Sequence, residues 1–137
     1  MQFKEIKHLL KKTKNGIKFI SKVFETKKAH AKQIVKNPVS TDALFKAIQE
    51  YLGKKLNGVN ITYQTRFIQD LNLSEETMLD LTFEIQNKFL PDGFLEYLVD
   101  NQIEMVKVSD MISMAEAFHL SKSFAQVREH RKKQKIR

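Results

Sequence analysis

Ser74, Glu75 and Glu76 place a hydroxyl and two carboxyl groups next to one another, where chemistry is conceivable. Two carboxyl groups can act as general acid and general base when both face one substrate. Neighbouring residues on a helix point in different directions, so Glu75 and Glu76 do not form such a pair. The order Ser-Glu-Glu is typical of a helix start, where the serine caps the first turn and the acidic residues suit the positive end of the helix dipole.

Other catalytic and metal-binding patterns are missing from the sequence. The chain has no cysteine, which excludes disulfides and thiolate metal sites. It has no glycine-rich phosphate loop, and Asp100, Glu104 and Asp110 lack the spacing of a calcium loop. The histidines are scattered and lack the spacing of metal ligands: His8, His30, His119 and His130. We therefore expect a protein that is not an enzyme and binds no metal.

The 137 residues carry a net charge of +8, but this charge is divided unevenly. Residues 1–38 sum to +9, residues 39–122 to −6 and residues 123–137 to +5. An acidic middle segment therefore lies between two basic arms, residues 1–38 and 123–137. Such arms are suited to contact RNA or an anionic membrane surface. The residues expected to anchor them are Lys11, Lys12, Lys18, Lys22, Arg131, Lys132 and Lys133.

The N-terminal arm has the hydrophobic period of a helix, with apolar residues at alternating spacings of three and four. The resulting stripe is carried by Phe3, Ile6, Leu10, Ile17, Ile20, Phe24, Ala31 and Ile34. We predict an amphipathic basic helix from Met1 to about Asn37, with Gly16 as a point where it can split in two. Packing on the domain, pairing with another chain, and binding lipid or nucleic acid all remain open for it.

The middle segment predicts a set of helices joined by turns. Ser40 or Thr41 caps a first helix that runs to about Leu56, and Ser74 caps a second. A short helix is expected over residues 94–99, and a last one begins at Ser109. Residues 59–73 are expected to form an irregular loop, anchored by Val59, Ile61, Phe67, Ile68 and Leu71.

Five short motifs follow one another through this segment. They are Tyr51-Leu52-Gly53 at the first helix end, Phe67-Ile68-Gln69-Asp70-Leu71 before the second helix, Asp80-Leu81 and Phe89 within it, and Val108-Ser109-Asp110 before the last. In this order residues 40–120 resemble an acyl carrier protein, a member of the phosphopantetheine-binding family. Its corresponding features are a closing Leu-Gly, F-x-x-D-L, E-L, a closing Phe and T-V-x-D.

The resemblance implies a 4′-phosphopantetheine arm on the serine of a D-S-L motif at the start of the second helix. Here Ser74, Glu75 and Glu76 hold those three positions, so the attachment position is Glu75, which cannot form the phosphodiester. A one-residue slip would bring Ser74 there, which makes Ser74 the candidate for cofactor binding. The resemblance also implies that the second helix docks onto a basic patch of a protein partner, through Glu75, Glu76, Met78, Leu79, Asp80 and Glu84.

We therefore predict an all-α fold, an acyl-carrier-like four-helix bundle of three main helices and one short helix, preceded by the basic amphipathic helix. Its expected segments are residues 1–38, 39–122 and 123–137. The expected function is a non-catalytic docking or adaptor protein without a cofactor. The alternatives are a working carrier of fatty-acid or polyketide-type synthesis modified at Ser74, and a basic helical nucleic-acid-binding protein. No apolar run approaches the roughly 20 residues of a membrane span, and the expected location is the cytoplasm or, alternatively, an organelle matrix.

Overall fold

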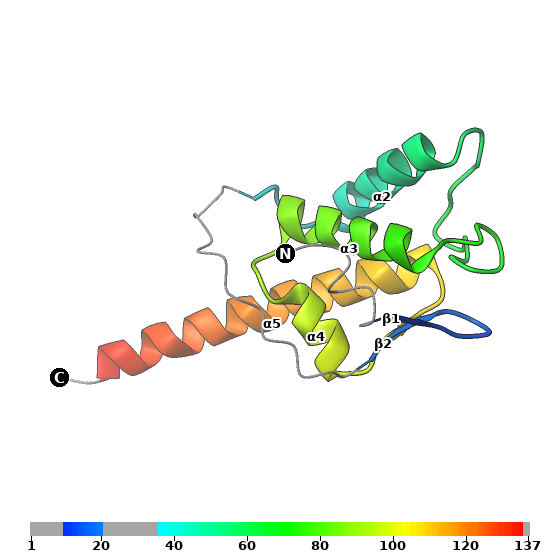
Figure 1. Cartoon of the computed structure of the whole chain (residues 1–137). Coiled ribbons are helices and arrows are strands. Elements are labelled where there is room, and N and C mark those ends of the chain that lie inside the picture. Colours follow the sequence, from blue (N-terminus) through cyan, green and yellow to red (C-terminus); the bar gives the residue numbers. More distant parts are fainter. Residues whose placement is uncertain (1–9, 21–35, 136–137) are drawn as a thin grey trace.

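Helices and a small sheet together make up the fold. The computed structural model describes residues 10–20 and 36–135, with side chains up to residue 125. Figure 1 shows the arrangement of its elements. In chain order they are β1 (Leu10–Lys12), β2 (Ile17–Phe19), α2 (Thr41–Lys55), α3 (Glu75–Phe89), α4 (Phe94–Asp100), β3 (Glu104–Met105) and α5 (Val108–Lys135).

The sheet contradicts the prediction of an all-α fold. Its three strands lie in the order β1-β2-β3, and both neighbouring pairs are antiparallel. Leu10 pairs with Phe19 across the hairpin, and Ile17 pairs with Met105 of β3. The fold is therefore a mixture of helices and strands, with the N-terminal hairpin extended by a strand from the second half of the chain.

The amphipathic helix predicted over residues 1–37 is also wrong where the structure describes it, because residues 10–19 form this hairpin. Leu10, Ile17 and Phe19 are buried, whereas Lys11 is exposed and Lys18 is half-buried, as the alternation of strand faces requires. Asn15-Gly16 lies at the turn, a pair typical of hairpins. The rest of the predicted helix, residues 1–9 and 21–35, lies outside the described residues.

Gly16 is required by the close approach of the hairpin to β3. A Cβ atom at this position would lie 2.8 Å from the Met105 carbonyl oxygen and 2.9 Å from Cγ2 of Val106. Any other residue at position 16 would push the hairpin away from the segment that precedes α5.

The helix starts at Ser40 and Ser74 agree with the predictions. Ser40 Oγ accepts a hydrogen bond from the Ala43 backbone N–H at 3.1 Å, and Asp42 lies in the first turn of α2. The α2 face that is buried carries Leu44, Ala47, Ile48 and Leu52, at helical spacing. Local capping and periodicity therefore account for these two helices.

The connection between α2 and α3, residues 56–74, is tied to the segment before α5. The Phe67 N–H donates to the Val106 carbonyl at 2.9 Å, and the Val108 N–H donates to the Thr65 carbonyl at 2.9 Å. Of the predicted loop anchors, Ile61, Phe67 and Leu71 are buried and Ile68 is partly buried. Val59 is not an anchor, because 40% of it is exposed.

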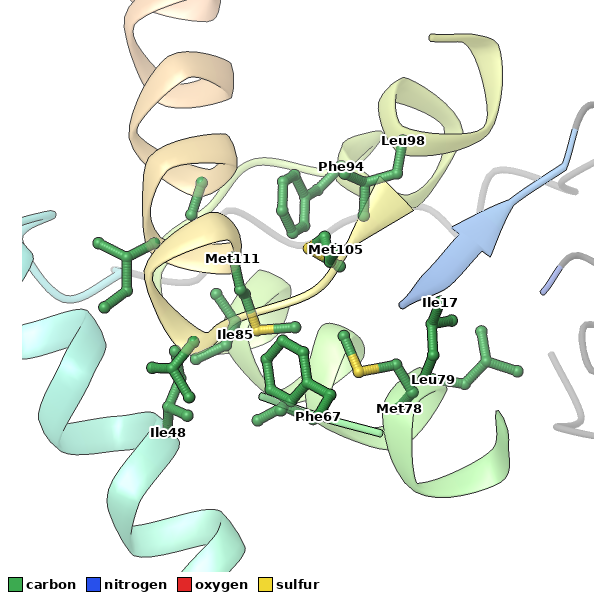
Figure 2. Packing of buried hydrophobic residues seen from close by; sticks show 14 of the residues in the cluster. Ile17, Ile48, Phe67, Met78, Leu79, Ile85, Phe94, Leu98, Met105 and Met111 are labelled. Atoms are coloured by element: carbon green, nitrogen blue, oxygen red, sulfur yellow. The ribbon is translucent and has the colours of Figure 1, made fainter. Parts of the chain in front are cut away.

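One hydrophobic cluster joins the hairpin to the helices. Figure 2 shows Ile17, Phe67, Met105 and Met111 among its buried side chains, which come from strand, loop and helix. Leu10, Ile17 and Phe19, which precede residue 38, belong to the same core as the buried residues of the helices. Burial of these three side chains is what holds the hairpin on the helices.

Helix α5 includes most of the C-terminal basic arm. Its buried residues lie in its first half: Val108, Met111, Ile112, Ala115 and Phe118. The helix then continues through Lys135 and extends past the other described elements (Figure 1). Residues 123–135 are therefore helical in backbone.

Candidate functional site at the start of α3

Ser74 is the N-cap of α3. Its backbone is extended, with φ −77° and ψ 161°, and its Oγ accepts a hydrogen bond from the Thr77 backbone N–H at 3.2 Å. Ser74 Oγ also lies 3.0 Å from the Thr77 hydroxyl oxygen. Ser74 therefore stands just outside the helix, and Glu75 is the first helical residue.

The backbone before Ser74 is held on both sides. Asn72 has a positive φ of 48°, a conformation that asparagine adopts more readily than most residues. Its N–H donates to the Ile68 carbonyl at 2.9 Å, and the Leu73 N–H donates to the Phe67 carbonyl at 3.0 Å. Leu71 and Leu73 are buried on either side of it. The position of Ser74 is therefore determined by buried neighbours and not only by its own cap.

Arg66 and Asp70 close this turn with an ion pair. The Asp70 carboxylate accepts from Arg66 Nη2 at 3.0 Å, from Nε at 3.3 Å and from the Arg66 backbone N–H at 2.8 Å. The hydrogen bonds from the Arg66 side chain and backbone hold the pKa of Asp70 below its usual value. Asp70 is the acidic residue of the motif that resembles F-x-x-D-L, and here it has a structural role.

The hairpin reaches the same site. Lys12 Nζ on β1 donates to the Asn72 side-chain carbonyl at 3.2 Å. Of the predicted basic anchors, Lys12 thus lies beside the residues that precede α3. Lys11 and Lys18 lie on the same hairpin as Lys12. Lys22 lies outside the described residues. Arg131, Lys132 and Lys133 lie in the last turns of α5, whose C-terminal half runs away from the hairpin (Figure 1).

The acidic residues of α3 do not form one free surface. Glu75 is half-buried and Glu76 exposed in the first turn. The Asp80 carboxylate accepts a hydrogen bond from the Tyr51 hydroxyl of α2 and lies 3.8 Å from Lys55 Nζ. Glu84 forms an ion pair of 2.9 Å with Lys88, one turn further along α3. Asp80 and Glu84 are therefore partly neutralised within the chain.

The sequence analysis did not identify the Tyr51 hydroxyl as a functional group of this site. Its burial raises its pKa well above the usual range, and the hydrogen bond from its hydroxyl to Asp80 and the negative charges of Asp80 and Glu84 raise it further. The signal in the sequence is weak, because Tyr51 lies on the apolar face of α2 and its partner lies on another helix. Only the packing of α2 on α3 reveals the contact.

Met78 and Leu79 correct the predicted docking surface. Both side chains are fully buried in the core, because this side of α3 faces the hairpin and the other helices. They stabilise the fold and do not belong to a surface that a partner can contact. Thr82 is also buried and donates to the Met78 carbonyl at 2.8 Å. The predicted docking residues that reach the surface are Glu75, Glu76, Asp80 and Glu84.

Two further observations bear on ligands and membranes. Among the side chains that the structure describes, in residues 10–20 and 36–125, no three His, Asp or Glu gather in a way that would hold a metal ion. None of the helices that the structure describes is long and apolar enough to cross a membrane.

Comparison with known proteins finds no relative of this chain. No protein-family model, no curated protein and no solved structure matches it. The residues of the site are thus the basis for any statement about function.

Proposed function

We propose that this chain is a non-catalytic docking protein, related in design to an acyl carrier protein but without the prosthetic arm. The order of its helices supports this proposal. The helices α2 and α3 are followed by the short α4 and then by α5, and the resemblance to the carrier family implies three main helices and one short helix. The N-terminal hairpin and β3 are not part of what the resemblance implies.

The start of α3 is the observation that carries the proposal. A carrier needs a serine hydroxyl as the oxygen that forms the phosphodiester with phosphopantetheine. The first helical residue, which is the attachment position under the resemblance, is Glu75, and the serine before it accepts the hydrogen bond that caps α3. With Glu75 at the attachment position, the site does not fit the phosphopantetheine group.

Docking is assigned to the N-terminal end of α3. Asp80 and Glu84 are paired with Lys55 and Lys88, whereas the half-buried Glu75 and the exposed Glu76 lie in the first turn of α3. A basic patch on a protein partner would meet these two carboxylates at the end of the helix, where Glu76 is exposed and opposite charges attract across an interface. Asp80 and Glu84 then contribute to the edge of the contact.

A working carrier modified at Ser74 is the second candidate, because one observation favours it. Ser74 is exposed at the start of the second long helix, where a modifying enzyme would find it. The two candidates differ in one measurable property, the covalent mass of the protein after exposure to a phosphopantetheinyl transferase and coenzyme A.

Docking is tested with a protein that recognises carriers, a promiscuous phosphopantetheinyl transferase. Titration of the isotope-labelled chain should perturb amide signals of the first turn of α3, and the double substitution Glu75→Gln/Glu76→Gln should weaken binding at least tenfold. Glu50→Gln, an exposed carboxylate on α2, is the matched control and should leave binding unchanged. No binding by the unmodified chain, or equal weakening by the control, would contradict docking through this end of α3.

A further inference from the structure

Helix α5 carries an exposed apolar face that the rest of the described chain does not cover. Three large hydrophobic residues are exposed among the described side chains: Val59, Leu120 and Phe124. Leu120 is 54% exposed and Phe124 is 62% exposed. They are four residues apart on α5, so they lie on one face of the helix.

These two residues belong to a longer pattern, which we call the α5 stripe. Spacings of four and three residues continue in both directions from Leu120 and Phe124, as in the seam of a coiled coil. Its positions are Ser113, Ala117, Leu120, Phe124, Val127 and Arg131. The first two residues of this stripe, Ser113 and Ala117, have small side chains. The middle residues, Leu120 and Phe124, have large apolar side chains.

The α5 stripe faces away from the core. The buried residues of α5 are Val108, Met111, Ile112, Ala115 and Phe118. At about 100° per residue, the stripe lies on the opposite side of the helix from these residues. Phe118 packs against Phe94 and Tyr97 of α4, with ring centroids 5.5 and 5.3 Å apart, and Thr41 at the start of α2 donates to Glu116 at 2.9 Å. The body of the protein therefore covers α5 from other sides.

We propose that the α5 stripe pairs with the α5 stripe of a second copy of this chain, in antiparallel orientation. The centre of the pair lies between Leu120 and Phe124, so that Leu120 of each copy meets Phe124 of the other. The same register places the small Ala117 opposite Val127, and Ser113 opposite Arg131. A two-fold axis relates the copies, which gives a closed dimer.

The charges along α5 select the antiparallel orientation. Within α5, residues 108–121 contain Asp110 and Glu116 and no Lys or Arg, whereas residues 122–135 carry six Lys and Arg residues and one Glu. An antiparallel pair brings the acidic half of each helix level with the basic half of the other. A parallel pair would set two strongly basic halves side by side and is opposed by their repulsion.

The bodies of the two copies do not compete for the same space. The other helices and the sheet of each copy pack on the face of α5 opposite the stripe. In the pair they therefore lie on the two outer sides. The C-terminal half of α5 extends past the other described elements (Figure 1).

Sedimentation equilibrium of the full-length chain tests the dimer. We expect a dimer at micromolar concentration and a monomer in the variant Leu120→Gln/Phe124→Gln. Val59→Gln is the matched control, because Val59 is also exposed but lies outside α5, and it should remain dimeric. Since the substituted side chains are exposed, circular dichroism should report an unchanged fold for each variant.

Single cysteines test the register, because the chain has none of its own. Ser121→Cys lies next to the two-fold axis and should form an intermolecular disulfide on oxidation. Ser113→Cys should not, because the antiparallel register separates its two copies by about 27 Å along the helices. A disulfide through Ser113→Cys would contradict the antiparallel orientation.

Two other occupants of the stripe would overturn the proposal. A monomer at all concentrations whose thermal midpoint falls in Leu120→Gln/Phe124→Gln would mean that residues of the same chain cover the stripe. A monomer that dimerises only when an RNA oligonucleotide is added would mean that the basic half of α5 binds phosphates and not a second helix.

Discussion

The Tyr51 hydroxyl on α2 donates a hydrogen bond to the Asp80 carboxylate on α3, and this contact joins the two helices at their exposed edge. Lys55 completes the group, with its Nζ 3.8 Å from Asp80 and 5.8 Å from the centre of the Tyr51 ring. Asp80 therefore stabilises the packing of α2 on α3, in addition to any contact with a partner.

Replacement of Tyr51 by Phe should lower the free energy of unfolding by about 1 kcal/mol, because a hydrogen bond to a charged group is lost at a half-exposed position. Tyr97→Phe is the matched control. The Tyr97 ring packs on Phe118, and none of the hydrogen bonds among the described residues uses its hydroxyl. Urea unfolding of both variants makes the comparison, and equal losses would mean that the contact with Asp80 contributes nothing.

Alkaline pH should weaken the same contact. The pKa of Tyr51 in the folded chain lies above the value of about 10 for an unfolded tyrosine. Its contribution to stability is thus complete below pH 10 and is lost as the pH rises towards the folded pKa. The difference in unfolding free energy between the wild type and Tyr51→Phe should be constant up to about pH 9 and shrink above pH 10. A difference that grows with pH would contradict the raised pKa.

Gly16 and Gly53 should respond in opposite ways to alanine. Gly16→Ala should destabilise the chain by about 1–3 kcal/mol, because the new methyl group meets the Met105 carbonyl oxygen at 2.8 Å. Gly53→Ala lies in α2 with nothing within 4 Å of the added atom, and it should be neutral or stabilise by up to about 1 kcal/mol. Thermal unfolding gives both values. A tolerated Gly16→Ala would show that the hairpin does not pack tightly on β3.

The helices were predictable from the sequence because their signals are local. Ser40 and Ser74 each precede acidic residues and a period of apolar residues, and both cap helices. The hairpin was not predicted, because Leu10 and Ile17 are seven residues apart and suit a helical stripe as well as two strands. Asn15-Gly16 was the local signal for the turn, but the pairing of Ile17 with Met105 depends on residues far along the chain.

The site was predictable only in part for a similar reason. The positions of Ser74, Glu75 and Glu76 follow from capping rules. Which side of α3 faces the core depends on the hairpin, so Met78 and Leu79 were assigned to the surface although both are buried. The partner of Asp80 lies on a different helix, and no pattern within α3 indicates it.

The cap at Ser74 can be tested by stability. Ser74→Ala should lower the free energy of unfolding by about 1 kcal/mol, because the Thr77 N–H loses its acceptor. Ser74→Asp keeps an acceptor at the same place and should remain within a few tenths of a kcal/mol of the wild type. If both variants were as stable as the wild type, the hydroxyl would have no structural use, and a role in attachment would gain weight.

The intact mass of the protein tests the central claim most directly. The chain is co-expressed with a promiscuous phosphopantetheinyl transferase, beside Ser74→Ala and a carrier protein known to be modified. We predict that the control carrier gains one phosphopantetheine group while the mass of this chain stays at the value of its sequence. A gain of one group that disappears in Ser74→Ala would contradict the account and make the chain a working carrier with a displaced attachment serine.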